Sequence, residues 1–226
     1  MTKYFISPPF GNYIHLPKTI SIYGSFTIQP RNGLLRQMIK TLRYIPKYRG
    51  WVNAIGLRNK GISWALKKVP ENQIISIAIM NFSDIDTLLS QIPENRNIEI
   101  NISCPNVDKN INYKDLGKFV NPKRKWCIIK LSPKVSQKHI SELYFQGFRQ
   151  FHCCNTLPVP EGGLSGIALR PYVSSLLTHL RENYKDVVLI AGGGISSIQD
   201  MEYYKSYGAD HFSISTGLWK IFWKFF

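Results

Sequence analysis

Polar and glycine-containing motifs recur along the chain, and all but one directly follow a short apolar run. The exception, Gly162–Gly166, is predicted to lie in a loop after the sixth run. Taken singly, every one of them is compatible with ordinary turn chemistry. Their regular succession after consecutive apolar runs instead indicates one shared site to which each run contributes. In chain order the motifs are Asn101–Asn106 (NISCPN), Lys130–Pro133 (KLSP), Asn155-Thr156, Gly162–Gly166 (GGLSG), Gly192–Gly194 (GGG) and Ser213–Gly217 (SISTG).

The last two motifs are suited to bind a phosphate. Gly192–Gly194 lead into a predicted helix and leave backbone N–H groups open to an anion. Ser215-Thr216-Gly217 can do the same ahead of the final helix. The two segments together predict a phosphorylated ligand.

Asparagines are the second chemical feature of these motifs. Asn101, Asn106 and Asn155 lie in them, and Asn53 and Asn59 lie in the segment after the second apolar run. An asparagine side chain offers both hydrogen-bond donors and an acceptor. This set therefore suits a planar ligand with alternating amide N–H and C=O groups.

The elements that must position these residues are short strands alternating with amphipathic helices. Several of the apolar runs have no polar face, which is typical of parallel strands covered on both sides. Eight strands are expected: Tyr4–Ser7, Ile20–Phe26, Ile74–Met80, Ile98–Ile102, Cys127–Leu131, Phe151–Cys154, Val187–Ala191 and His211–Ile214.

Eight strands with intervening helices predict a single α/β domain over residues 1–226, a compact (β/α)8 TIM barrel. The connection Pro8–Thr19 is too short for a full first helix, and the last helix, Leu218–Phe226, is also short. In such barrels function collects at the carboxyl ends of the strands, where the polar motifs fall. A doubly wound open sheet is the competing architecture, but no glycine-rich turn follows the first strand.

Serines mark the expected starts of three helices. Ser83, Ser136 and Ser197 each precede an amphipathic segment and are predicted to cap it. A fourth helix is predicted over Pro171–Tyr184, where leucines and a valine recur at helical spacing.

The composition of the chain indicates in which compartment the protein works. No apolar run approaches the roughly 18 residues of a membrane span, and the four cysteines form no CxxC pair, so a cytoplasmic, reducing compartment is expected and no metal site.

The net charge of +15 favours anionic partners. The basic residues are scattered, however, and no nucleic-acid-binding motif accompanies them, so specific nucleic-acid binding is not expected.

The aromatic run Leu218–Phe226 is interpreted as a barrel-covering or homodimer-interface helix, with a membrane-surface helix as the alternative.

The motifs resemble those of the dihydroorotate dehydrogenase family in order and spacing. NISCPN, KLSP, GGLSG and the Gly193-Gly194-Ile195 triplet carry the resemblance, and Val52–Gly61 (VNAIGLRNKG) is closest to the substrate loop of the class 1B enzymes. Gly24–Arg31 and Ser7–Gly11 resemble further family segments, so the resemblance covers nearly the whole chain.

The resemblance implies an FMN-dependent oxidation of dihydroorotate to orotate in pyrimidine biosynthesis. Cys104 would be the catalytic base that removes the C5 proton, since a thiolate with a lowered pKa is a competent base. An electron-transfer partner subunit is a further implication, and either fumarate or NAD could be the final acceptor. The residues implied for FMN are Ser7, Ser25, Asn101, Lys130, Gly166, Gly193, Gly194, Ser215 and Thr216. Those implied for dihydroorotate are Asn53, Gly56, Leu57, Asn101, Asn106, Asn155 and Thr156.

One position departs from the family pattern. The family places a lysine near Gly24 in class 1 or near Gln29 in class 2, and neither residue is lysine here. The alternative function is therefore a catalytically reduced barrel of the same family with a structural or binding role in a larger assembly.

Overall fold

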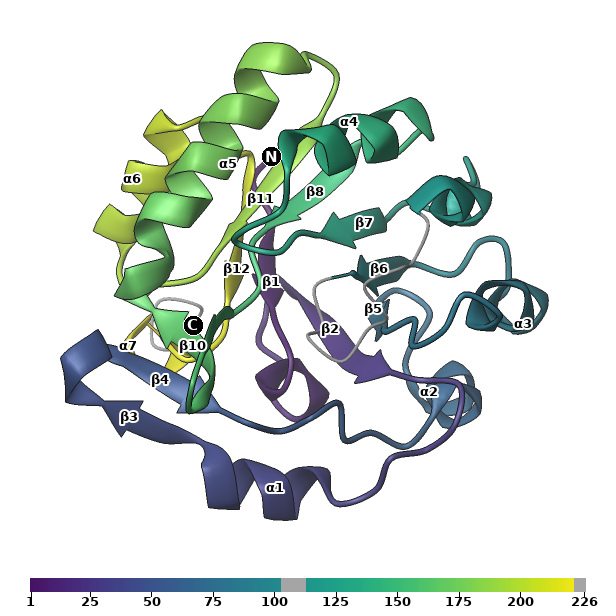
Figure 1. Ribbon diagram of the computed structural model, residues 1–226, viewed down its shortest axis with the longest axis horizontal. Helices are drawn as coiled ribbons and strands as arrows, with labels where there is room; N and C mark the ends of the chain where they lie inside the picture. The colour runs from purple at the N-terminus through teal and green to yellow at the C-terminus, as the bar shows by residue number, and fades with distance from the viewer. Residues whose placement is uncertain (103–112, 222–226) are drawn as a thin grey trace.

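Eight parallel strands close into a barrel in the computed structural model, which describes residues 1–102 and 113–221 (Figure 1). All eight predicted runs form barrel strands, although Ile74–Met80 is shortened to β5. The (β/α)8 fold class is thus confirmed. Around the barrel the order is β1 (Tyr4–Ile6), β12 (His211–Ile214), β11 (Val188–Gly192), β8 (Gln150–Cys153), β7 (Cys127–Lys130), β6 (Ile98–Asn101), β5 (Ile74–Ile77) and β2 (Thr19–Phe26).

Helices surround the barrel wall (Figure 1). They are α2 (Ile62–Lys68), α3 (Asp84–Gln91), α4 (Gln137–Phe145), α5 (Arg170–Asn183) and α6 (Ile198–Ser206). Two predicted caps are confirmed, because the Ser136 side chain accepts from His139 N–H and the Ser197 side chain from Asp200 N–H. The predicted helix cap at Ser83 is wrong. Ser83 has helical backbone angles and no capping bond, and Asp84 instead accepts from the N–H groups of Met80 and Asn81.

The first connection and the last helix are short, as expected. Between β1 and β2 the chain forms only the 3₁₀ turn η1 (Phe10–Asn12), and α7 covers Leu218–Ile221. The remainder of the aromatic run, 222–226, lies outside the described residues. Within the described part of the chain, no helix is long and apolar enough to cross a membrane.

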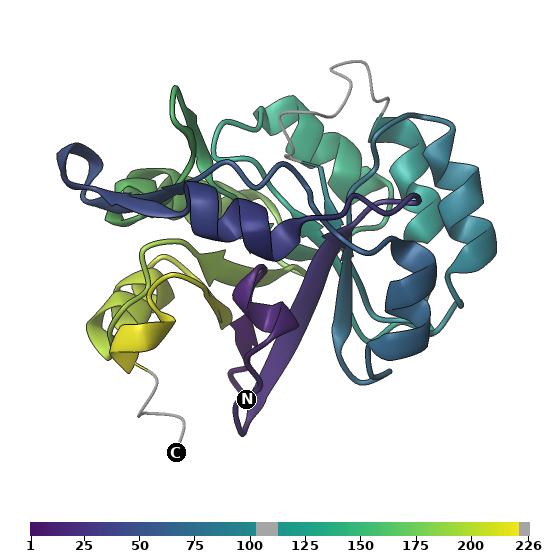
Figure 2. The same ribbon diagram turned by 90° about the horizontal axis from the view of Figure 1, so that it is seen from below.

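A second, four-stranded antiparallel sheet was not predicted. It has the order β3 (Arg43–Ile45), β4 (Gly50–Asn53), β10 (Gly162–Gly166) and β9 (Leu157–Val159), and helix α1 (Leu34–Thr41) precedes it. Figure 2 shows the β3–β4 part and α1 at the end of the barrel away from the N-terminus. The GGLSG motif is therefore strand β10 rather than the predicted loop, because pairing with β4 satisfies its backbone.

The barrel interior has an apolar layer and a polar layer. Side chains on alternate positions of parallel strands point inward together. The lower layer is a buried apolar cluster that includes Phe5, Ile22 and Trp126. Two residues further along the strands come polar side chains that are also buried: Ser7, Ser76, Glu99, Lys130, His152 and Ser213. The polar layer lies toward the carboxyl ends of the strands, where barrel sites form.

Candidate active site

A cavity of about 70 Å³ lies at the carboxyl ends of the barrel strands, partly covered by the second sheet. Ligand pockets usually enclose roughly 300–1,000 Å³. Leu42, Ile55 and Phe10 are the larger apolar side chains that line it. The cavity is therefore smaller than the space that a cofactor-sized ligand usually occupies.

Eight of the fourteen described residues that the resemblance implies for the site line this one cavity. They come from loops that are distant in sequence but meet at the barrel mouth. The lining residues named by the sequence are Ser7, Asn53, Lys130, Asn155, Thr156, Gly193, Ser215 and Thr216.

Ser25 and Asn101 are joined to the cavity by hydrogen bonds. Asn101 Nδ2 donates to Ser25 Oγ over 2.9 Å, and Asn155 Nδ2 donates to Asn101 Oδ1 over 3.0 Å. Asn155 lines the cavity, so Asn101 and Ser25 are connected to the cavity through Asn155.

Three other predicted residues are placed differently. Gly56 and Leu57 do not line the cavity; both have positive φ and belong to the segment that follows β4. Asn59 is buried and holds backbone together, donating to Thr27 Oγ1 and Leu57 O and accepting from Gly61 N–H. Asn59 therefore holds backbone segments together and does not line this cavity, although it lines the cavity beside Gly24. Cys104 and Asn106 lie outside the described residues.

The glycine loops at β10 and β11 have the shape of an anion cradle. Gly166, Gly193 and Gly194 all have positive φ. A Cβ at Gly193 would lie 2.7 Å from Leu169, and one at Gly194 would lie 3.0 Å from the Gly166 carbonyl oxygen. Only glycine fits this close backbone approach. With the Ser215-Thr216 loop beside it, the donor set fits the phosphate of a mononucleotide.

A buried ion pair lies directly beneath the cavity. Glu99 is fully buried, and its Oε1 atom lies 3.9 Å from Lys130 Nζ. Burial alone would raise the pKa of Glu99, but the Lys130 ammonium and hydrogen bonds from His152 and Ser76 outweigh it and hold the pKa at about 2. Burial and the Lys130 charge lower the pKa of His152. His152 is therefore neutral, and its Nδ1–H donates to Glu99 Oε2 over 2.7 Å.

Sequence reasoning missed Glu99, although a signal was present. A lone carboxylate inside an otherwise apolar strand (Ile98-Glu99-Ile100) is unusual, since charged residues are rarely buried unpaired. Strand alternation also places it on the same face as Asn101. His152, from strand β8, is likewise buried.

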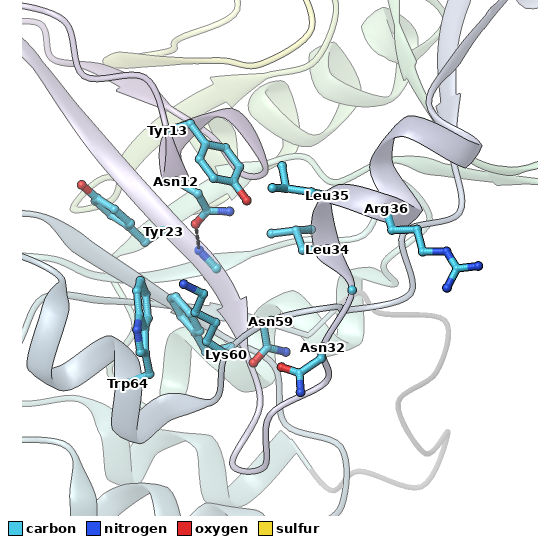
Figure 3. Close-up of a pocket in the computed structure, with 13 residues that line it drawn as sticks. Asn12, Tyr13, Tyr23, Asn32, Leu34, Leu35, Arg36, Asn59, Lys60 and Trp64 are labelled. Carbon is cyan, nitrogen blue, oxygen red and sulfur yellow. Dashed lines mark hydrogen bonds between the residues drawn. The ribbon is translucent and has the colours of Figure 1, made fainter.

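A larger cavity of about 340 Å³ lies next to Gly24 (Figure 3). Tyr13, Tyr23 and Trp64 give it aromatic walls, and Asn12 Oδ1 accepts from Gly24 N–H over 2.8 Å. Gly24 is one of the two places near which the family pattern has a lysine, the other being Gln29. The φ of 118° at Gly24 and a Cβ position only 2.5 Å from Ser76 O exclude a side chain from this backbone.

Restoring a lysine at this position should therefore destabilise the protein. For Gly24→Lys we expect a loss of about 2–4 kcal/mol, from the positive φ and from overpacking. The melting temperature should fall by about 5–15 °C. Gln29→Lys is the matched control: Gln29 is exposed, and its replacement should change stability by less than about 0.5 kcal/mol. A Gly24→Lys variant as stable as this control would contradict the argument.

Fold and site together define a (β/α)8 barrel with a phosphate-type glycine cradle and an amide-lined, cationic mouth. A family model described as dihydroorotate dehydrogenase matches residues 18–224. The chain belongs to the dihydroorotate dehydrogenase family.

Individual relatives agree with this assignment. The dihydroorotate dehydrogenase B (NAD(+)) catalytic subunit of Malacoplasma penetrans is 31% identical over 205 residues, covering 74% of this chain and 66% of that protein. The same subunit of Latilactobacillus sakei is 27% identical over 244 residues, covering 92% and 78%. The solved structure of ligand-free DHODH from Eimeria tenella has a TM-score of 0.73 at 17% identity and covers 96% of this chain and 79% of that one. That structure supports the fold alone.

Proposed function

We propose that this chain is an FMN-dependent dihydroorotate dehydrogenase that oxidises dihydroorotate to orotate in pyrimidine biosynthesis. The observation that carries the proposal is the convergence of Lys130, Asn155 and the loops at Gly193 and Ser215-Thr216 on one cavity. Family membership supports the same reaction. The alternative of a structural or binding role is not favoured, because the relatives are named as catalytic subunits.

Different groups of residues would bind the cofactor and the substrate. Bound FMN would accept the hydride from C6 of dihydroorotate. Cys104, three residues after the end of β6, would remove the proton from C5. The phosphate would be held by Gly166, Gly193, Gly194, Ser215 and Thr216, the ring by Ser7, Ser25, Asn101 and Lys130, and dihydroorotate by Asn53, Gly56, Leu57, Asn101, Asn106, Asn155 and Thr156.

The proposal also covers the domain organisation, the compartment and the partners of the protein. We propose one FMN-binding barrel domain over residues 1–226, acting in the cytoplasm as a homodimer with an electron-transfer partner subunit. The names of the relatives as catalytic subunits of NAD(+)-linked enzymes support such a partner, with NAD as the final acceptor.

Binding of FMN to the purified protein is the direct test. Protein titrated with FMN should show a bound-flavin visible spectrum. At 100 times the dissociation constant, FMN should stabilise the fold by about 2.7 kcal/mol, which raises the melting temperature by about 5–10 °C. Riboflavin, which lacks the phosphate, should produce a smaller shift because the glycine cradle has nothing to hold. A colourless protein with no thermal shift in excess FMN would rule the proposal out.

A further inference from the structure

The imidazole of His152 reaches the candidate active site with one ring nitrogen bonded and the other open. His152 is only 1% exposed and lines the small cavity at the barrel mouth. Its Nδ1–H donates to the ionised Glu99 carboxylate over 2.7 Å, so the neutral ring keeps a lone pair on Nε2. Among the described residues, no donor reaches Nε2. Buried polar atoms nearly always have a hydrogen-bond partner, so we expect the partner of Nε2 to be a molecule in the cavity.

The open nitrogen lies beside the glycine cradle. A Cβ at Gly192 would lie 2.5 Å from His152 Nε2, so a side chain at this position would displace the imidazole ring. Gly192 and Gly193 both line the cavity, and Gly193 belongs to the cradle that fits a phosphate. The Nε2 atom is therefore close to the segment that would hold the phosphate end of a mononucleotide.

Lys130 provides the complementary group next to this acceptor. Lys130 and His152 are direct neighbours in the β7–β8 pairing, and both line the cavity. The Lys130 ammonium is a donor only, and it lies 3.9 Å from Glu99 Oε1, which is beyond hydrogen-bond distance. A ligand group that satisfies both side chains accepts from Lys130 and donates to His152. FMN has two groups of this kind, the ribityl hydroxyls and the C=O and N3–H edge of its ring.

We propose that His152 is a cofactor-binding residue whose Nε2 atom accepts a hydrogen bond from an O–H or N–H donor of FMN. Glu99 makes this role possible, because it holds the imidazole proton on the other ring nitrogen. The arrangement selects a ligand with a donor at this point over one that presents only a carbonyl or phosphate oxygen. The inference rests on the proposed function, since it takes FMN as the ligand.

Titration with FMN, followed by flavin fluorescence, tests the bond. In His152→Asn the shorter amide can still donate to Glu99 but has no atom in the place of Nε2. The FMN donor is then left unpaired, and the dissociation constant of FMN should rise by about 5- to 150-fold. His139→Asn makes the same substitution on the outer helix α4 and should bind FMN as wild type does.

Two FMN analogues identify the donor and separate the bond from packing. In 3-deaza-FMN a C–H group replaces N3–H, and a 5-phosphopentyl flavin has no ribityl hydroxyls. The analogue that lacks the donor should bind wild type more weakly than FMN does. The same analogue should lose much less affinity for His152→Asn, where the bond is already absent. Such coupling with 3-deaza-FMN would assign the bond to N3–H, and coupling with the pentyl analogue would assign it to a ribityl hydroxyl.

Imidazole ¹⁵N shifts of the flavin-free protein test the tautomer without any ligand. Wild type should carry the His152 proton on Nδ1 at neutral pH, and a proton on Nε2 would overturn the proposal. If His152→Asn did not fold, a crystal structure of wild type with FMN would decide. An FMN donor within about 3.2 Å of Nε2 supports the bond, and a water molecule or an apolar contact there contradicts it.

Failure of the inference and failure of the proposed function give different results. FMN affinity that is equal in wild type and His152→Asn, or no coupling with either analogue, would overturn the role of His152 and leave the proposed function standing. Wild-type protein without a bound-flavin spectrum in excess FMN would overturn both.

Discussion

Replacing Cys104 with alanine should slow the reduction of bound FMN by dihydroorotate by about 10²–10⁴-fold, the usual worth of a general base. Cys104 stands in the NISCPN motif directly after β6, whose last residue, Asn101, accepts a hydrogen bond from Asn155 in the cavity lining. The measurement is the anaerobic half-reaction, because overall turnover also depends on the electron acceptor. FMN content and orotate affinity should change little.

Cys104→Ser provides the matched variant. The family's other class uses serine as the base, so this variant should recover part of the rate at high pH. Equal rates of flavin reduction in wild type and Cys104→Ala would show that Cys104 is not the base. If neither protein reduced its bound FMN, the substrate assignment itself would be wrong.

The barrel strands could be predicted because their sequence signal is local. A run such as Val187–Ala191 is apolar on both faces, as is typical of strands inside a helix-covered barrel. The helix starts at Ser136 and Ser197 were predictable for a similar reason, since the capping bond spans only three residues. At Ser83 the serine pattern led to a wrong prediction. Ser83 makes no capping bond, and the neighbouring Asp84 instead accepts from an N–H group that precedes the helix.

The second sheet and the polar layer could not be predicted in this way. Strand β10 is rich in glycine, which favours a turn. It forms a strand by pairing with its neighbour β9 and with β4, which lies more than a hundred residues earlier. The role of Glu99 could not be predicted from its own strand, because its partners Ser76 and Lys130 come from the adjacent strands. The convergence of Lys130 with the glycine loops was predictable, because (β/α)8 topology alone brings strand ends together.

The barrel polar layer makes Lys130 important for folding as well as for binding. Glu99 is fully buried, and Lys130 supplies its ammonium partner. In Lys130→Met the carboxylate stays buried without that partner, and the expected loss is about 3–5 kcal/mol. This is a large part of the roughly 5–15 kcal/mol that stabilises a typical domain. The double variant Lys130→Met/Glu99→Gln should recover much of the loss, because it removes the unpaired charge.

The pH dependence of that loss distinguishes a charge effect from a packing effect. In wild type, the lowered pKa of Glu99, about 2, contributes stability that is fully present above the unfolded-state pKa near 4.5 and is lost as pH falls toward 2. Without Lys130, burial dominates and raises the pKa of Glu99, so the variant is penalised most at neutral pH. Protonation of His152, no longer opposed by Lys130, acts in the same direction. Denaturant unfolding should therefore show a smaller difference between wild type and Lys130→Met at pH 5 than at pH 7.5. A difference that is equal at both pH values, or a double variant no more stable than the single one, would mean that Lys130 stabilises the barrel by packing alone.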